Sequence, residues 1–140
     1  MGATLTVQLT VSRLADPTDV KGSYGPRTYA VQLAIALDQE IEVPLPPNAV
    51  GVAVAIPPVG PTGPQFVLIR SDTPGITYTR NAELVVNTIG GGPFPPPVAG
   101  PPGGFHALAG APLSGVNPLT TLTFSNPNNT PAKAYILVAG

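Results

Sequence analysis

The sequence contains no cysteine and no tryptophan, and its single histidine is His106. Without cysteine there is no disulfide framework, no thiolate nucleophile and no zinc–thiolate site, and the redox compartment cannot be inferred. One histidine gives little material for a catalytic triad or a metal centre, and no serine or aspartate stands in a recognisable nucleophile motif. We therefore expect a protein that is not an enzyme and binds no cofactor, and we assign His106 no role.

Charged side chains are scarce as well, at 9% of the residues with a net charge of −1, against roughly 25% in typical soluble domains. The few basic residues form no cluster, which argues against nucleic-acid binding. No apolar run approaches the ~20 residues of a membrane span, and the first ten residues lack the pattern of an export signal. We therefore expect no nucleic-acid partner, no membrane partner and no export. So few charges leave apolar areas on a monomer, which predicts a homo-oligomer.

Proline and glycine are abundant instead, with 20 and 16 residues in a chain of 140. Such a content can signal disorder, but 43% of the residues are hydrophobic, and disordered chains lack this much apolar surface. The length suits one domain better than two. We expect a single folded domain over residues 1–140.

Hydrophobic and other residues alternate along most of the chain, as half-buried strands require. The clearest strand covers residues 3–11, and the same pattern recurs at residues 29–45, 50–56, 120–124 and 132–138. Residues 84–86 form a short continuous apolar run, which is typical of a sandwich interior. Eight to ten short strands separated by turn residues, with no helical periodicity, predict an all-β fold: a single antiparallel β-sandwich or jelly roll.

The alternating faces predict a core. We expect the following side chains to be mainly buried: Leu5, Val7, Leu9, Val31, Leu33, Ile35, Val43, Val52, Val54, Leu68, Val85, Leu122 and Ile136. Some opposite faces carry alanine and glycine rather than polar residues, as at residues 30–36 and 49–55. Small side chains suit the close approach of a second sheet or another subunit.

The alternation over residues 29–45 is too long for one strand. At ~3.3 Å per residue such a strand would span about 55 Å, whereas a compact domain of this length is ~37 Å wide. Two solutions remain: a hairpin that turns at residues 38–40 and places Ile35 opposite Val43, or a sharp bend with a bulge.

Three carboxylates, Asp38, Glu40 and Glu42, alternate along one strand face. Such a row could form a calcium site or a glycosidase pair. A solvated face, or a guard against edge-to-edge strand pairing, is the simpler interpretation.

The most distinctive segment is Gly90 to Gly104, which contains six glycines and six prolines. It cannot be a central strand, and it is either a passive loop or an extended arm. An arm of polyproline stiffness loses little entropy on binding, and Phe94 would supply its apolar anchor. The candidate protein-interaction residues are Pro93, Phe94, Pro95, Pro96, Pro97 and Val98.

A short, cysteine-free, Pro/Gly-rich chain of alternating strands, with segments such as residues 42–52 (EVPLPPNAVGV), resembles the small all-β structural proteins of tailed bacteriophages. In that group, decoration (cement) proteins sit on the capsid exterior, commonly as trimers. The resemblance implies a non-enzymatic virion protein, assembled in the host cytoplasm. Its implied partners are itself, as a homotrimer, and the major capsid or another virion protein.

Three alternatives remain. Related sandwiches occur in phage tails and fibres. A receptor- or carbohydrate-binding module would need an exposed aromatic pair with Asn or Asp neighbours, although most of the eight aromatic residues lie in strand segments and suit core packing. A jelly-roll enzyme would need clustered histidines and carboxylates, and one histidine makes it the weakest alternative.

Overall fold

A computed structural model of the protein describes residues 2–13, 24–35, 37–59, 63–81, 83–90, 104–109 and 118–140. These residues form strands joined by turns, with every strand pair antiparallel, which confirms the all-β expectation. No helix in this part of the chain is long and apolar enough to cross a membrane. The strands are β1 (Ala3–Arg13), β2 (Tyr24–Ile35), β3 (Asp38–Leu45), β4 (Val52–Ala55), β5 (Phe66–Ser71), β6 (Ile76–Arg80), β7 (Asn87–Ile89), β8 (Phe105–Ala109), β9 (Thr121–Ser125) and β10 (Ala132–Ala139).

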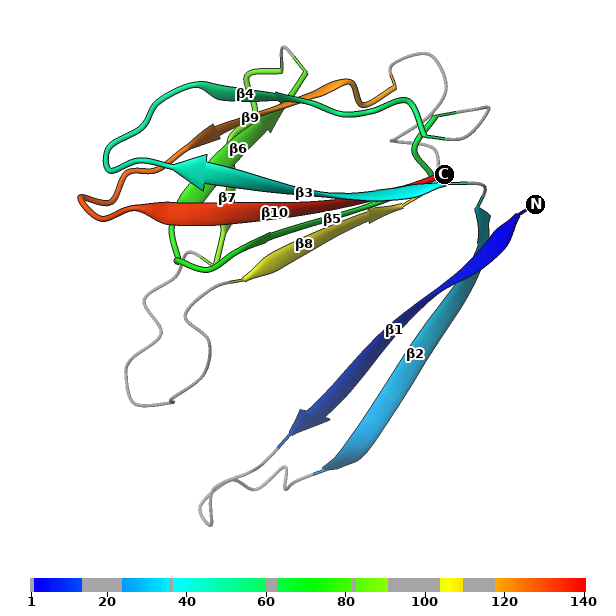
Figure 1. Ribbon diagram of the computed structural model, residues 1–140. Coiled ribbons are helices and arrows are strands. Elements are labelled where there is room, and N and C mark those ends of the chain that lie inside the picture. The colour runs from blue at the N-terminus through cyan, green and yellow to red at the C-terminus, as the bar shows by residue number, and fades with distance from the viewer. Residues whose placement is uncertain are drawn as a thin grey trace.

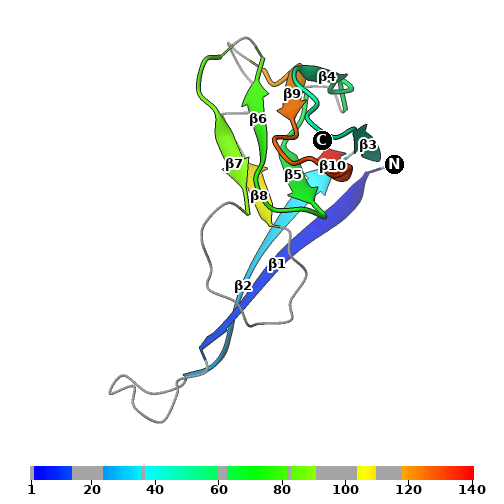
Figure 2. The ribbon, with the colours of Figure 1, turned by 90° about the vertical axis from the view of Figure 1, so that its left-hand side faces the viewer.

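Strands β3 to β10 form a sandwich of two four-stranded sheets (Figures 1 and 2). One sheet has the order β3-β10-β5-β8 and the other β4-β9-β6-β7. The pairing is nested along the chain, because β3 pairs with β10, β4 with β9, β5 with β8 and β6 with β7. The first and last strands of this unit therefore lie side by side.

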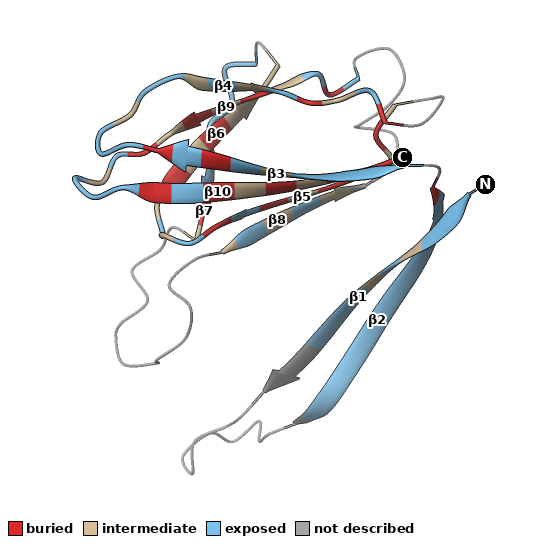
Figure 3. Ribbon diagram, in the orientation of Figure 1, coloured by how far each residue is buried: buried red, intermediate tan, exposed pale blue. Residues whose placement is uncertain are grey.

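Alternation along the strands builds the core between the sheets. On β10, Ala132 and Ala134 are buried, whereas Lys133 between them is exposed, as a strand with one inward face requires. Ile136 and Val138 continue the buried face. The other sheet contributes the fully buried Leu122 and Phe124 from β9. Buried residues concentrate in the sandwich (Figure 3).

Strands β1 and β2 form a separate hairpin that extends away from the sandwich (Figures 1 and 2). Their antiparallel register places Ala3 opposite Ile35 and Leu9 opposite Tyr29. A two-stranded hairpin is at best marginally stable alone in water, so it needs an apolar surface to pack against.

The stretch 29–45 is divided between two sheets and does not form a hairpin. Strand β2 ends at Ile35 and pairs with β1, while β3 begins at Asp38 and pairs with β10, so Ile35 does not lie opposite Val43. Leu37 already belongs to the sandwich, because it and Gly140 each donate a backbone N–H to the other's carbonyl oxygen at 2.9 Å. The hairpin alternative at residues 38–40 is therefore wrong, and the chain instead divides this stretch between two sheets.

The predicted core is confirmed in part. Four of its residues are buried, namely Ile35, Val43, Leu122 and Ile136. Six more are half-buried: Leu5, Val7, Leu33, Val52, Val54 and Leu68. The prediction is wrong for the exposed Leu9, Val31 and Val85. Leu9 and Val31 lie on the outer half of the hairpin, beyond the reach of the sandwich.

Val85 is exposed because the chain makes a corner before β7. Asn81 adopts a positive φ of 51°, and its Oδ1 accepts hydrogen bonds from the backbone N–H groups of Thr120 and Thr121. Pairing of β7 with β6 starts only at Asn87. Residues 84–86 therefore precede the sheet and are exposed to solvent rather than buried in the sandwich, which corrects the interpretation of this apolar run.

Candidate functional site

The β1–β2 hairpin has one apolar and one polar face. The antiparallel register places Leu5 opposite Leu33, Val7 opposite Val31 and Leu9 opposite Tyr29, all on the same face. The other face carries threonine, glutamine and alanine, and across it the hydroxyls of Thr10 and Thr28 lie 3.3 Å apart. A hairpin of this kind buries one face and leaves the other in water.

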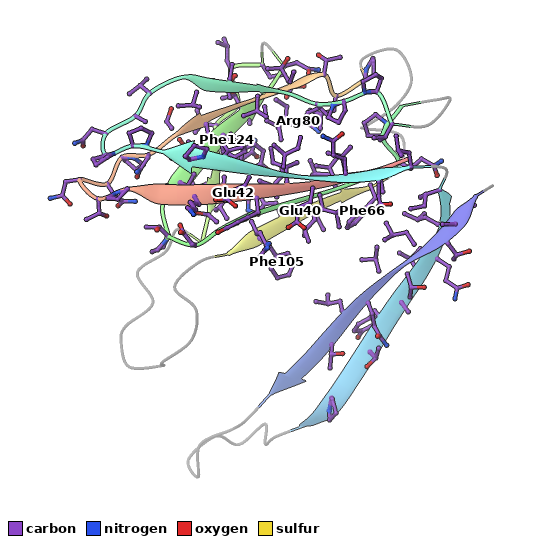
Figure 4. All side chains as sticks on the ribbon, viewed as in Figure 1. Glu40, Glu42, Phe66, Arg80, Phe105 and Phe124 are labelled. Carbon is purple, nitrogen blue, oxygen red and sulfur yellow. The ribbon has the colours of Figure 1, made fainter. Side chains whose placement is uncertain are left out.

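The base of the hairpin packs on the outer face of the β3-β10-β5-β8 sheet. From the hairpin, Leu5, Val7, Leu33 and Ile35 contribute to this cluster. From the sheet come Phe66, Leu68, Leu137 and Ala139, and in Figure 4 Phe66 lies beside the hairpin base. This second small core anchors the hairpin to the sandwich.

None of the described residues covers the outer half of the apolar face in this way. Leu9 is 48% exposed, Tyr29 59% and Val31 48%, although they continue the row that Leu5 and Leu33 begin. Contiguous apolar surface of this kind is typical of surfaces that contact another molecule. We call Leu9, Tyr29 and Val31 the hairpin patch.

The outer face of the β3-β10-β5-β8 sheet, on the side of the hairpin, carries both aromatic and charged side chains. Phe105 on β8 is 57% exposed and points toward the hairpin side (Figure 4). Beside it, the Arg70 guanidinium lies 4.4 Å from the centre of the Tyr135 ring and 3.4 Å from a Glu40 carboxylate oxygen. The ring face and the carboxylate both favour the cation, although such exposed interactions contribute little to stability.

The acidic row of β3 is exposed on the outer face of an edge strand. Glu40 forms an ion pair with Arg70. The carboxylate of Glu42 lies 2.8 Å from the Lys133 ammonium, and its hydrogen bond and negative charge raise the pKa of Lys133. Within the described residues, no three His, Asp or Glu side chains gather as a metal site would require. The arrangement favours a solvated face that guards the edge of the sheet.

His106 lies on the inner face of β8, where its Nδ1 is 2.8 Å from the Tyr78 hydroxyl. The two rings meet edge to face, with centres 5.6 Å apart. Tyr78 belongs to the opposite sheet, so this hydrogen bond ties the two layers together. Sequence reasoning missed the contact because the partners are 28 residues apart.

Replacing Tyr78 with phenylalanine should lower the free energy of unfolding by about 1 kcal/mol at neutral pH, the usual net value of one hydrogen bond. Burial raises the pKa of Tyr78 above its ordinary value, and Arg80 opposes this shift only in part. The native state thus holds the phenolic proton more tightly than the unfolded state does. The associated stability is complete below pH ~10 and is lost as the pH rises through the folded-state pKa.

Urea unfolding at neutral and alkaline pH checks this prediction. The native chain should lose more stability than Tyr78→Phe between the two conditions. Tyr29→Phe, at an exposed tyrosine, is the matched control and should follow the native chain. Equal pH dependence in all three proteins would contradict the assigned role of Tyr78.

The proline-rich candidate residues 93–98 lie outside the described part of the chain, so the arm stays a prediction. The positions that flank it are described. A Cβ on Gly104 would lie 2.7 Å from the Cα and N atoms of Gly90, so the two backbones are in close contact. The Gly104 carbonyl accepts the Ser71 N–H at 3.1 Å, and the Ile89 carbonyl accepts the Gly75 N–H at 3.0 Å. The ends of the segment are thus held side by side by the sandwich.

Comparison of this chain with protein-family models, with curated proteins and with solved structures finds no match.

Proposed function

We propose that this protein is a non-enzymatic structural protein of a tailed-bacteriophage particle, most closely a capsid decoration (cement) protein. In this proposal it works as a homo-oligomer bound to the major capsid protein or another virion protein. The observation that carries it is the hairpin patch, an apolar surface that no described residue covers and that suits contact with another protein chain. The scarcity of charge agrees with a working state inside an assembly.

The strand connectivity supports the same proposal. Eight strands in two sheets, nested so that the first pairs with the last, are the arrangement expected of a jelly roll. Viral capsid domains and lectins are among the proteins that use this architecture. Architecture alone does not establish function, so the proposal depends on the exposed surfaces.

Detection of the chain in purified virions, together with its mass by light scattering, tests the proposal. We expect the chain to remain with particles through density-gradient purification and to be multimeric in isolation. A strictly monomeric chain at high micromolar concentration that is missing from virions would overturn the proposal.

In this proposal the segment 90–104 is the arm that contacts a neighbouring subunit or the capsid. Because Gly90 and Gly104 lie side by side, a short glycine-serine linker in place of residues 91–103 should leave the sandwich folded. We expect this variant, and Phe94→Ala, to weaken particle attachment in a pull-down with virions. Unfolding of the linker variant, with normal attachment of Phe94→Ala, would identify the segment as an internal loop instead.

A receptor- or carbohydrate-binding module, or a tail or fibre component, is the alternative. The exposed rings of Tyr29 and Phe105 favour it, because sugars stack on such rings, although the two lie in separate sheets. Saturable glycan binding that is lost in Tyr29→Ala would support this alternative.

A further inference from the structure

We propose that β1 of one copy pairs antiparallel with β1 of a second copy, so that two hairpins form one four-stranded sheet. This inference deepens the proposed function, because it names the contact through which the chain associates with itself. It rests on the free edge of β1, on the sequence of that strand and on the hairpin patch.

The free edge of β1 lacks the devices that normally prevent strand pairing. Within the described residues, β1 pairs only with β2, so its outer edge offers unpaired N–H and C=O groups. From Ala3 to Ser12 the strand contains no charged residue and no proline. The first irregularity in its pairing comes between Val11 and Arg13. Native edge strands are usually short, charged, interrupted or covered.

The sandwich of the same protein does protect its edges. Its long edge strand, β3, carries Asp38, Glu40 and Glu42 on one face and Pro44 further along. The other edge strands, β4, β7 and β8, have only four, three and five residues. The contrast singles out β1, with 11 residues, as an edge built for pairing.

The sequence of β1 is nearly self-complementary about Val7. An antiparallel pairing centred there places Leu5 of one copy opposite Leu9 of the other, and Thr4 opposite Thr10. Apolar residues then meet apolar residues, and polar residues meet polar ones. A two-fold interface needs this property, because the same surface serves both copies.

The two-fold axis also explains the uncovered hairpin patch. If the two-fold axis is perpendicular to the four-stranded sheet, the apolar faces of both hairpins lie on the same side of that sheet. Each sandwich lies on this side too, because it packs on the apolar face at the base of its own hairpin. Antiparallel pairing sets the outer half of one hairpin beside the base of the other, so Leu9 lies next to the partner's Leu5. The patch thereby joins a larger apolar surface flanked by the second sandwich.

The opposite edge of the hairpin is less suited to this role. Strand β2 carries Pro26, which has no N–H to donate, and the charged Arg27 near its start. Pairing of β1 with β1 closes with two copies, whereas pairing of β1 with β2 of the next copy would build rings or open filaments. The inference therefore predicts a dimer and not the trimer that the phage resemblance implies.

Light scattering of charge variants tests the interface. We expect the native chain to have twice the mass of one chain, and Leu9→Lys combined with Val31→Lys to halve that mass. Val50→Lys combined with Leu84→Lys is the matched control, because it changes two exposed apolar residues outside the hairpin and should stay dimeric. Thermal unfolding followed by circular dichroism shows whether each variant retains the fold.

Disulfide trapping tests the register, and the cysteine-free chain makes each new cysteine unique. Pairing centred on Val7 places Thr6 opposite Gln8 of the second copy, on the exposed polar face. A mixture of Thr6→Cys and Gln8→Cys chains, one with an affinity tag, should therefore form a disulfide-linked heterodimer under mild oxidation. Neither variant alone should cross-link comparably, and Ala53→Cys on β4 should not cross-link with either.

The outcomes separate this inference from the proposed function. The β1 pairing would be overturned by a mass of three chains, by a multimer that persists after lysine replaces Leu9 and Val31, or by the absence of the disulfide-linked heterodimer. Association with virions would still support the structural role in each of these cases. A dimer that shows both effects but is missing from virions would support the pairing and count against the phage assignment.

Discussion

Replacing Phe124 with alanine is expected to lower the free energy of unfolding by about 3–5 kcal/mol, the largest effect of any single truncation in the sandwich. Phe124 is fully buried on β9, which lies between β4 and β6. Its ring centre is 6.0 Å from that of Tyr78, so the truncation removes an aromatic contact as well as buried surface. The rigid strands on both sides limit collapse into the resulting cavity.

Urea unfolding followed by circular dichroism measures this change. Phe105→Ala serves as the matched control, because Phe105 is a strand phenylalanine on an exposed outer face. We expect the control to change the unfolding free energy by less than about 1 kcal/mol. Similar losses in both variants would contradict the assignment of Phe124 to the core.

Replacing Asn126 with aspartate is the second substitution with a large expected effect. The Asn126 side chain is buried, and its Nδ2 donates to the carbonyl oxygens of Leu45, Pro46 and Thr130 at 3.2, 3.1 and 2.8 Å. Its Oδ1 accepts the Asn128 N–H at 3.0 Å. An ionised carboxylate would face the three carbonyl oxygens with no proton to donate. We expect a loss of about 3–5 kcal/mol at neutral pH, as for an uncompensated buried charge.

The loss should depend on pH in a defined direction. Burial and the facing carbonyls disfavour the carboxylate, so the introduced acid has a raised pKa in the native state. The native state then binds its proton more tightly than the unfolded state, and part of the lost stability should return as the pH falls through the raised pKa. Thermal unfolding at pH values from about 4 to about 8 measures this difference.

Asn129→Asp is the control for this series, since Asn129 is an exposed neighbour in the same turn. Its stability should remain close to that of the native chain at each pH. A small, pH-independent effect of Asn126→Asp would show that the turn rearranges and that the three carbonyl contacts do not hold it.

The local sequence predicted the strands of this protein well. Alternation identified β1, β9 and β10 within two residues of their observed ends. It also placed Leu5 and Leu33 on apolar faces, and the hairpin register brings those faces together. These features depend on the two-residue period of a strand, which each segment expresses by itself.

Exposure was less predictable, as Leu9 and Leu5 illustrate. Both occupy the same face of the same strand, yet only Leu5 lies near enough to the sandwich to be covered. The difference comes from the change of sheet after Ile35, because β2 pairs with β1 while β3 pairs with β10, and the hairpin extends away from the sandwich (Figure 1). The alternation of residues around either leucine does not predict this change of sheet. The same holds for Val85, whose exposure depends on how Asn81 binds residues about 40 positions away.

The sequence alone determined that the chain is all-β, which residues share a strand face and how little charge its surface carries. The tertiary structure decided that β2 and β3 enter different sheets, that the outer edge of β1 pairs with no other described strand, and that Tyr78 meets His106 across the sandwich. The physical reason is that a two-residue period fixes the direction of each side chain relative to its own strand. What covers that side chain depends on pairing between residues distant in the sequence, and such pairing is settled only when the whole chain folds.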